Sequence, residues 1–232
     1  METGRPEPAA RGTLYVLATP IGNLEDIGLR ALRLLGEVDL IACEDTRQTV
    51  KILNRHGIRT KLLSFYQARE RQKAPAILQA LEEGRNVALV SDAGTPAISD
   101  PGFPLVRDAV RRGIRVVPIP GPCALTAALC ASGLPTHRFL FVGFPPPKAG
   151  ALRKWLSALR DEEGTLALYL PARRARSFLE AVLEVLGDRE VVIAREITKI
   201  HEEFRRGKAQ ALLDGADEAL GKGEMTVLIH GR

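Results

Sequence analysis

The chain reads LVSDAGTPAISDPG from Leu89 to Gly102, an apolar run that breaks into small, turn-forming residues with carboxylates among them. An apolar run bounded by turn residues is typical of a buried strand. In an open α/β sheet, a ligand binds at the loop that leaves the carboxyl end of such a strand. The stretch therefore predicts an α/β fold with a binding loop at residues 91–102.

On both sides of this stretch, short β-rich runs alternate with segments of helical periodicity. Strands are predicted at residues 14–18, 38–43, 61–65, 87–91 and 114–119. Strands that alternate with helices indicate a largely parallel sheet. The proline-rich seam at residues 118–122 prevents both a continuing strand ladder and a helix, so we place a domain boundary there. The expected divisions are a flexible segment at 1–12, an N-terminal α/β domain at 13–119 and a C-terminal α/β domain at 120–232.

The part of the chain beyond the seam predicts a second α/β unit. A small-residue helix is expected at 124–132, and a strand at 139–144 leads into three consecutive prolines. Further strands are predicted at 165–170, 191–197 and 225–229. Helices are predicted around 153–159, 175–186 and 208–220.

Composition narrows the functional classes. The formal net charge of +5 over 232 residues attracts polyanions, but it does not by itself identify a nucleic-acid-binding protein. The three cysteines form no disulfide or metal-ligand pattern, and the scattered histidines predict no metal site. Residues 1–12 lack the apolar core of a signal peptide, and no apolar run approaches the roughly 18 residues of a spanning helix. We therefore expect a cytoplasmic protein without a membrane segment.

Three turns, each predicted at the carboxyl end of a strand, carry residues suited to binding. The glycine of Pro20-Ile21-Gly22 lets a ligand approach the backbone. Asp92 offers a carboxylate to a ligand hydroxyl or ammonium, although the residues alone slightly favour a turn that only caps the next helix. The turn at 120–122 delivers a helix amino terminus, whose amides favour an anion. The chain has neither a Gly-x-Gly-x-x-Gly fingerprint nor a P-loop, which argues against NAD, FAD, a Rossmann-type methyltransferase and nucleotide hydrolysis.

Five motifs, taken together, resemble those of a known family. They are Pro20-Ile21-Gly22-Asn23-Leu24, Glu44-Asp45-Thr46-Arg47, residues 91–102, Pro120-Gly121-Pro122-Cys123-Ala124 and Lys222-Gly223-Glu224-Met225. From about Thr13 to Arg232 the chain resembles the small-subunit ribosomal RNA methyltransferases of the tetrapyrrole methylase (class III) superfamily. The resemblance implies two α/β domains with S-adenosylmethionine in the cleft between them, and usually a homodimer. The implied substrate is the 2′-hydroxyl of a cytidine in the decoding region of 16S ribosomal RNA.

The resemblance also implies which residues contact the cofactor. Carried onto this sequence, they are Pro20, Ile21, Gly22, Asp92, Gly94, Thr95, Cys123, Ala124 and Leu170. One segment departs from the family, because residues 169–174 read Tyr-Leu-Pro-Ala-Arg-Arg where members more often read Tyr-Glu, two small residues and His-Arg. No role of the missing Glu and His can therefore be carried over to this chain.

Methyl transfer to a hydroxyl requires loss of its proton, either to a positioned base or to water late in the reaction. Near the family motifs, the candidate catalytic residues are Glu44, Arg47, Glu196 and Lys199, with Asp45 as a further carboxylate. Asp45 or Thr46 has the competing role of capping the following helix. A strand through 195–199 would place Lys199 on the opposite face from Glu196.

Basic residues near the motifs are candidate RNA contacts. They are Arg47, Arg173, Arg174, Arg176, Arg195 and Lys199. The cluster at 173–176 is the densest, although most charge runs are only solvated helix faces. On their predicted strand, Arg195 and Lys199 have a competing role as partners of Glu202 and Glu203.

Two other functions use the same features. A methylase of tetrapyrroles or another small molecule would share the fold, but the Asn-Leu extension after Gly22 and the Glu-Asp-Thr-Arg motif argue against it. A non-catalytic RNA-binding ribosome assembly factor would explain the altered segment at 169–174.

Overall fold

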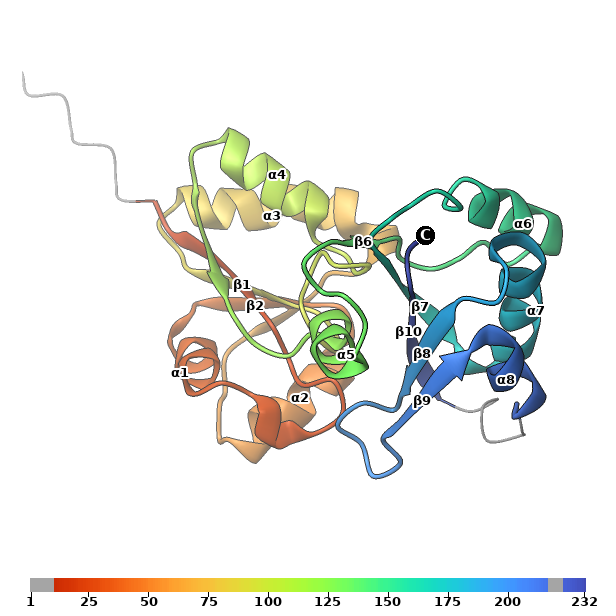
Figure 1. Ribbon diagram of the computed structural model, residues 1–232. Coiled ribbons are helices and arrows are strands. Elements are labelled where there is room, and N and C mark those ends of the chain that lie inside the picture. Colours follow the sequence, from red (N-terminus) through yellow and green to blue (C-terminus); the bar gives the residue numbers. More distant parts are fainter. Residues whose placement is uncertain (1–10, 217–222) are drawn as a thin grey trace, which may run out of the picture. The chain divides into compact units, whose positions relative to one another are not determined.

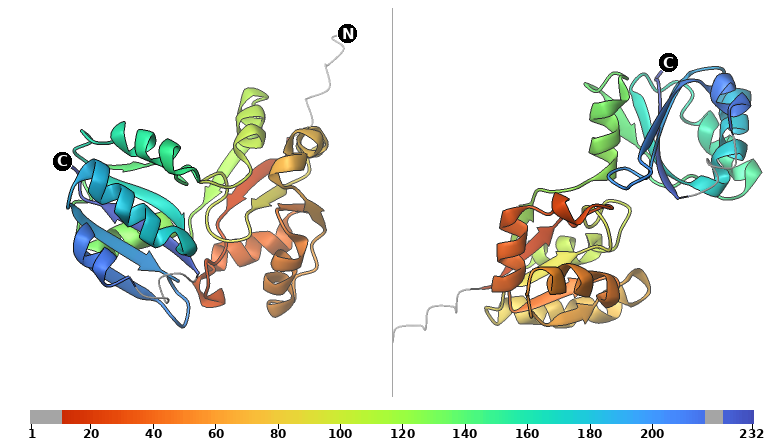
Figure 2. Two further views of the ribbon diagram at one scale, coloured as in Figure 1. Left: turned by 90° about the vertical axis from the view of Figure 1, so that its right-hand side faces the viewer. Right: turned by 90° about the horizontal axis from the view of Figure 1, so that it is seen from below.

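The chain forms two compact α/β units in a computed structural model, which describes residues 11–216 and 223–232. The units lie within residues 1–122 and 123–232, and each contains its own five-stranded sheet (Figures 1 and 2). The first unit therefore ends at Pro122, slightly later than the boundary expected at 119. The predicted segment at 1–12 falls mostly outside the described residues.

The first unit has a wholly parallel sheet in the order β3-β2-β4-β1-β5. Its strands and helices are β1 (Thr13–Leu17), α1 (Leu29–Glu37), β2 (Leu40–Cys43), α2 (Thr46–Arg55), β3 (Leu62–Ser64), α3 (Glu70–Glu82), β4 (Val87–Val90), α4 (Phe103–Arg111) and β5 (Arg115–Ile119). Short 3-10 turns occur at Leu24–Asp26 and Gln67–Arg69. The strands predicted in this half of the chain are all present, with ends that differ by one or two residues.

Successive residues of the inner strands of this sheet face opposite layers. Ile41 and Cys43 pack with α1 and α2, whereas Ala42 packs with α3 and α4. Burial on both faces explains the continuous apolar runs of β2 and β4. Pro118 is tolerated inside β5 because this strand is at the sheet edge and pairs only with β1.

The second unit has a mixed sheet in the order β6-β7-β10-β8-β9. Its elements are α5 (Ala124–Ser132), β6 (Phe139–Phe141), α6 (Ala149–Ser157), β7 (Thr165–Pro171), a 3-10 turn (Ala172–Arg174), α7 (Ala175–Leu186), β8 (Glu190–Arg195), β9 (Glu203–Lys208), α8 (Ala209–Asp214) and β10 (Glu224–Ile229). Among the described strands of this sheet, β6 and β7 form the one parallel pair. The parallel arrangement predicted for the first sheet is thus confirmed, whereas the sequence set no strand direction for the second sheet, which is mixed.

The second sheet packs α6, α7 and α8 on one face and α5 on the other (Figure 2). The strand β9 was not predicted, and the strand predicted at 191–197 ends at Arg195. The helix predicted at 208–220 is present as α8 but already ends at Asp214, and positions 217–220 of the prediction lie outside the described residues. No helix among the described residues is long and apolar enough to cross a membrane.

Candidate functional site

Two of the predicted turns are joined at the carboxyl end of the first sheet. The N–H of Thr19 donates to the oxygen of Gly94, and the N–H of Gly94 donates to the oxygen of Thr19, each at 2.9 Å. The Thr19 hydroxyl also donates to the Ser91 oxygen at 3.0 Å. Because β1 and β4 are neighbours in the sheet, this bridge brings the turn at 20–22 beside the loop at 91–102.

The bridge depends on a left-handed glycine. Gly94 has a φ of +87°, and a Cβ there would lie 3.4 Å from Cγ2 of Ile21. The neighbouring Thr95 hydroxyl donates to the oxygen of Pro122 at 3.1 Å, which ties in the third predicted turn. The first unit thus holds parts of all three turns together.

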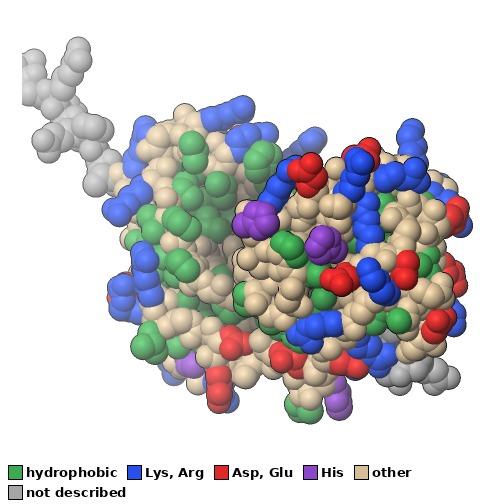
Figure 3. All heavy atoms as spheres, in the orientation of Figure 1, with side chains coloured by type: hydrophobic (Ala, Val, Ile, Leu, Met, Phe, Trp, Pro, Cys, Tyr) green, Lys and Arg blue, Asp and Glu red, His purple; other side chains and the backbone are tan. Residues whose placement is uncertain are grey.

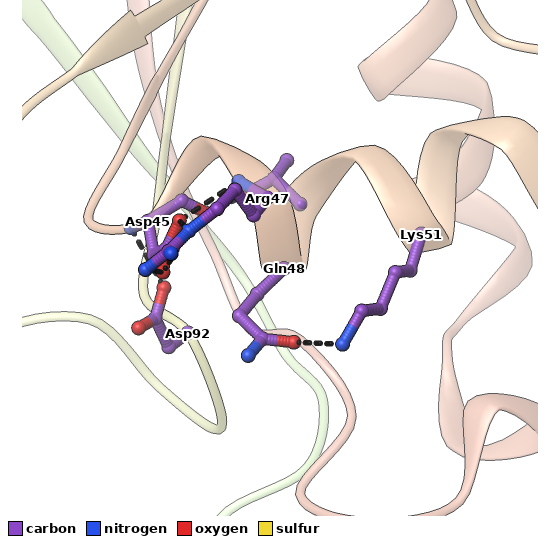
Figure 4. A network of polar contacts seen from close by, with 6 residues as sticks. Asp45, Arg47, Gln48, Lys51 and Asp92 are labelled. Carbon is purple, nitrogen blue, oxygen red and sulfur yellow. Dashed lines mark hydrogen bonds and ion pairs between the residues drawn. The ribbon is translucent and has the colours of Figure 1, made fainter.

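Asp92 connects this assembly to the turn after β2. Its Oδ1 accepts the backbone N–H of Asp45 at 2.8 Å (Figure 4). Its other carboxylate oxygen accepts no protein hydrogen bond within the described chain. Asp92 does not cap the following helix, because the N-cap of α4 is Gly102, so the capping interpretation is wrong.

Asp45 caps α2, as one of the two sequence interpretations expected. Its carboxylate accepts the backbone N–H of Arg47 at 2.8 Å and pairs with the Arg47 guanidinium at 2.6 Å (Figure 4). The side-chain hydrogen bond from Arg47 lowers the pKa of Asp45 to about 2. The Arg47 side chain stays 87% exposed.

Glu44 is the one carboxylate of its motif that forms no hydrogen bond or ion pair with another described residue. Burial raises its pKa, and the negative charges of Asp92, Asp100 and Asp45 raise it further. Burial also raises the pKa of Asp92. Within the described residues, no His, Cys, Asp and Glu side chains are grouped so as to hold a metal ion.

The loop after Asp92 has a strained backbone, and its end is held by Glu70, a residue that the sequence did not single out. Ala97 and Ser99 have φ angles of 67° and 65°, a region that non-glycine residues rarely occupy. The loop ends at Gly102, whose N–H donates at 2.9 Å to the carboxylate of Glu70, a side chain from α3 that is almost wholly buried. A single Glu in a polar segment carries no local signal for this contact.

The segment at 195–199 is not a strand throughout, so the predicted alternation of its side chains is wrong. The chain leaves β8 at Arg195, and Glu196 and Thr198 have φ angles of 51° and 68°. Lys199 pairs with the Glu196 carboxylate at 3.1 Å instead of facing away from it. Although burial acts to raise it, the pKa of Glu196 is lowered by the N–H of Glu224 and by Lys199.

Two of the predicted RNA-binding arginines have partners within the second unit. Arg195 pairs with Glu203 at 3.1 Å and is mostly buried. Arg174 donates to the oxygens of Pro145 and Pro146, and so holds the triple-proline loop. Arg173 and Arg176 are exposed.

The cofactor residues predicted in the second unit occupy two different environments. Cys123 is the N-cap of α5 and Ala124 is its first residue, both half-buried. The Leu170 side chain is 2% exposed and belongs to the core under α7, so only its backbone is accessible to a ligand.

Comparison with known proteins gives a consistent family. Residues 13–213 match the family model for tetrapyrrole (corrin/porphyrin) methylases. The chain is 48% identical to ribosomal RNA small subunit methyltransferase I of Halalkalibacterium halodurans, over 95% of this chain and 76% of that protein. It is 46% identical to the protein of the same name from Thermotoga maritima, over 95% and 99%. The Escherichia coli O157:H7 protein of that name is 48% identical over 96% and 79%.

Solved structures share the fold at low sequence identity. Diphthine synthase aligns with a TM-score of 0.70 at 16% identity, over 94% of this chain and 90% of that one. A cobalt precorrin-4 methyltransferase of cobalamin biosynthesis aligns with a TM-score of 0.66 at 18% identity, over 94% of both chains. Both comparisons bear out the predicted two-sheet α/β fold.

Proposed function

The chain belongs to the tetrapyrrole methylase family, with relatives named ribosomal RNA small subunit methyltransferase I, and from this premise we propose that it methylates 16S ribosomal RNA. The proposed acceptor is the 2′-hydroxyl of a cytidine in the decoding region, and the proposed donor is S-adenosylmethionine. Identities of 46–48% over about 95% of the chain support the RNA substrate. The observation that carries the chemistry is the 2.8 Å bond between Asp92 and Asp45, which joins a cofactor loop to the turn that carries Glu44.

The chemistry of the three turns fits this cofactor. One oxygen of the Asp92 carboxylate is available to a ribose hydroxyl or an ammonium group, and the cofactor has both. The backbone N–H groups of Ile21, Ala93 and Thr95 donate to no protein group within the described residues, so they are available to its carboxylate. The proposed contacts of the first unit are Pro20, Ile21, Gly22, Asp92, Gly94 and Thr95.

The resemblance supplies the remaining cofactor contacts and the subunit arrangement as proposals. Cys123 and Ala124 would contribute from the start of α5, and Leu170 through its backbone. We also infer a homodimer, which sedimentation at micromolar concentration tests, since a monomer there would contradict it. A ribosomal substrate would place the reaction in the cytoplasm.

S-adenosylmethionine supplies a methyl group already activated on a sulfonium, so what remains is to align the reactants and to remove the hydroxyl proton. We propose Glu44 as the base, because its carboxylate has no competing protein partner in the described chain and its pKa is raised. Glu196 is a weaker candidate, because its pKa is lowered and it already pairs with Lys199. Arg47 would contact the RNA beside Glu44.

The RNA-binding role of the arginines at 173–176 is also a proposal. Arg173 and Arg176 are exposed, whereas Arg174 would act by holding the triple-proline loop. Replacing all three with glutamine should weaken binding of the ribosomal substrate and reduce its salt dependence. If affinity and salt dependence both stay unchanged, this cluster does not bind RNA.

The function is tested with labelled S-adenosylmethionine and 30S subunits from a strain that lacks the corresponding enzyme. Label on a ribose of the decoding region is expected. Label transferred to a tetrapyrrole but not to RNA would indicate the small-molecule methylase. RNA binding without transfer would indicate an assembly factor and would refute the proposed reaction.

A further inference from the structure

One face of α2 carries a row of exposed cations. The helix buries Thr49, Ile52 and Leu53, and its solvent-facing side presents Arg47, Lys51 and Arg55. These three residues, the α2 basic ridge, are spaced by four positions, so their side chains follow one another along the helix over about 12 Å. The ridge was not predicted as a unit, because only Arg47 belongs to a recognised motif.

The charge of the ridge is only partly neutralised. Arg47 pairs with Asp45, whereas the Lys51 ammonium donates at 2.8 Å to the uncharged amide of Gln48 (Figure 4). Arg55 has no carboxylate partner within the described chain. The helix sequence, TRQTVKILNR, contains no acidic residue. Two positive charges therefore remain available to an external anion.

The α2 basic ridge lies next to a group of carboxylates. The helix begins directly after Glu44 and Asp45, and Asp92 and Asp100 lie close enough for their charges to raise the pKa of Glu44. A nucleic acid brings phosphates toward this group of carboxylates and is repelled by it. Cations beside the carboxylates offset that repulsion, and the ridge is placed to do so.

Several other basic residues are distributed without a comparable row or already have partners within the protein. On the face shown in Figure 3, Lys and Arg side chains are scattered over both units among Asp and Glu. Three predicted RNA contacts, Arg174, Arg195 and Lys199, already have protein partners. The ridge differs from these in having two cations that are exposed and without carboxylate partners.

We propose that the α2 basic ridge binds the sugar-phosphate backbone of the RNA strand next to the nucleotide that is methylated. This inference rests on the proposed function and names the surface that the function uses. Phosphate contacts of this kind fix the position of a nucleic acid and carry no sequence information. The ridge therefore holds the strand while other residues select the cytidine.

The test is binding of a decoding-region RNA to the Lys51→Gln/Arg55→Gln variant as a function of salt. Loss of two phosphate contacts reduces the slope of log K against log[salt] by about 1.4, which corresponds to ~25-fold weaker binding at 0.1 M salt. S-adenosylmethionine affinity should not change, because neither residue belongs to the proposed cofactor site.

The matched control is Arg111→Gln/Arg115→Gln. It removes two exposed cations from the amino-terminal end of the same sheet, and Arg111, like Arg55, lies in the last turn of its helix. The control should keep the wild-type slope. A wild-type slope for the ridge variant, or equal weakening of RNA binding in both variants, would overturn the proposal that the ridge binds RNA. If the wild type still methylates the RNA in that case, the proposed function stands. Wild-type protein that neither binds nor methylates the RNA would overturn both.

Discussion

Replacing Gly94 with alanine perturbs the bridge between the two cofactor loops in a way that the structure allows us to calculate. The residue has a φ of +87°, and a left-handed conformation costs a non-glycine residue about 1–2 kcal/mol. The new Cβ would lie 3.4 Å from Cγ2 of Ile21 and 3.8 Å from the oxygen of Pro122, which is ordinary contact. The penalty therefore lies in the backbone.

This strain should appear in two measurements. If the variant keeps its native backbone, the free energy of unfolding falls by about 1–2 kcal/mol, measured by urea denaturation. If the free protein relaxes, it must open the hydrogen bonds between Gly94 and Thr19, and cofactor binding must close them again. Titration calorimetry should then show S-adenosylmethionine binding up to about 5–30-fold more weakly.

Gly133→Ala is the matched control. Gly133 has a φ of +83° at the end of α5, and a Cβ there meets open space. It should lose similar stability with no change in cofactor affinity. The reasoning is refuted if Gly94→Ala loses neither unfolding free energy nor S-adenosylmethionine affinity, or if Gly133→Ala weakens S-adenosylmethionine binding as much as Gly94→Ala does.

Substitutions at four further residues test the surroundings of this bridge. Glu44→Gln should lower kcat by about 10²–10⁴-fold with little change in cofactor affinity. Asp100→Asn removes a negative charge that raises the pKa of Glu44, so it should move the acid limb of the kcat/KM profile to lower pH than in the wild type. If the acid limb does not move, Glu44 is not the titrating base. The pKa of the Asp45 carboxylate is lowered to about 2, so the carboxylate should stabilise the fold fully above its unfolded pKa of 3.8 and lose this effect as the pH falls toward 2. The urea midpoints of the wild type and Asp45→Asn should therefore converge between pH 3.8 and pH 2. A constant difference between the two midpoints would contradict the lowered pKa of Asp45. Glu70→Ala should cost about 1–3 kcal/mol of unfolding free energy, because it leaves the buried N–H of Gly102 without its acceptor. Glu70→Gln keeps an acceptor oxygen and should cost less. Equal costs for the two variants would argue against this hydrogen bond.

The sequence was sufficient to predict elements whose burial shows directly in the pattern of apolar residues. The strands β2 and β4 are buried on both faces, so they appear as continuous apolar runs between turns. The helices α5 and α7 have the limits expected of them, because each ends at a glycine, Gly133 or Gly187. Grouping the three turns required only that parallel strands end at the same edge of a sheet.

The sequence was insufficient where long-range contacts decide the local structure. The strand β9, EFRRGK, is a charged edge strand without an apolar alternation. The turn after Arg195 uses left-handed Glu196 and Thr198, where neither glycine nor proline signals a break. The hydrogen bonds that Asp45 donates to Asp92 and that Gly102 donates to Glu70 join residues 47 and 32 positions apart, which no local pattern encodes.

The central claim is methyl transfer to a ribose, with Glu44 as the base. Nucleosides from 30S subunits, treated with S-adenosylmethionine and either wild-type protein or Glu44→Gln, can be separated and identified by mass spectrometry. We predict 2′-O-methylcytidine from the decoding region with the wild type and almost none with the variant. A methyl group found on a base, or equal ribose methylation by both proteins, would contradict the account.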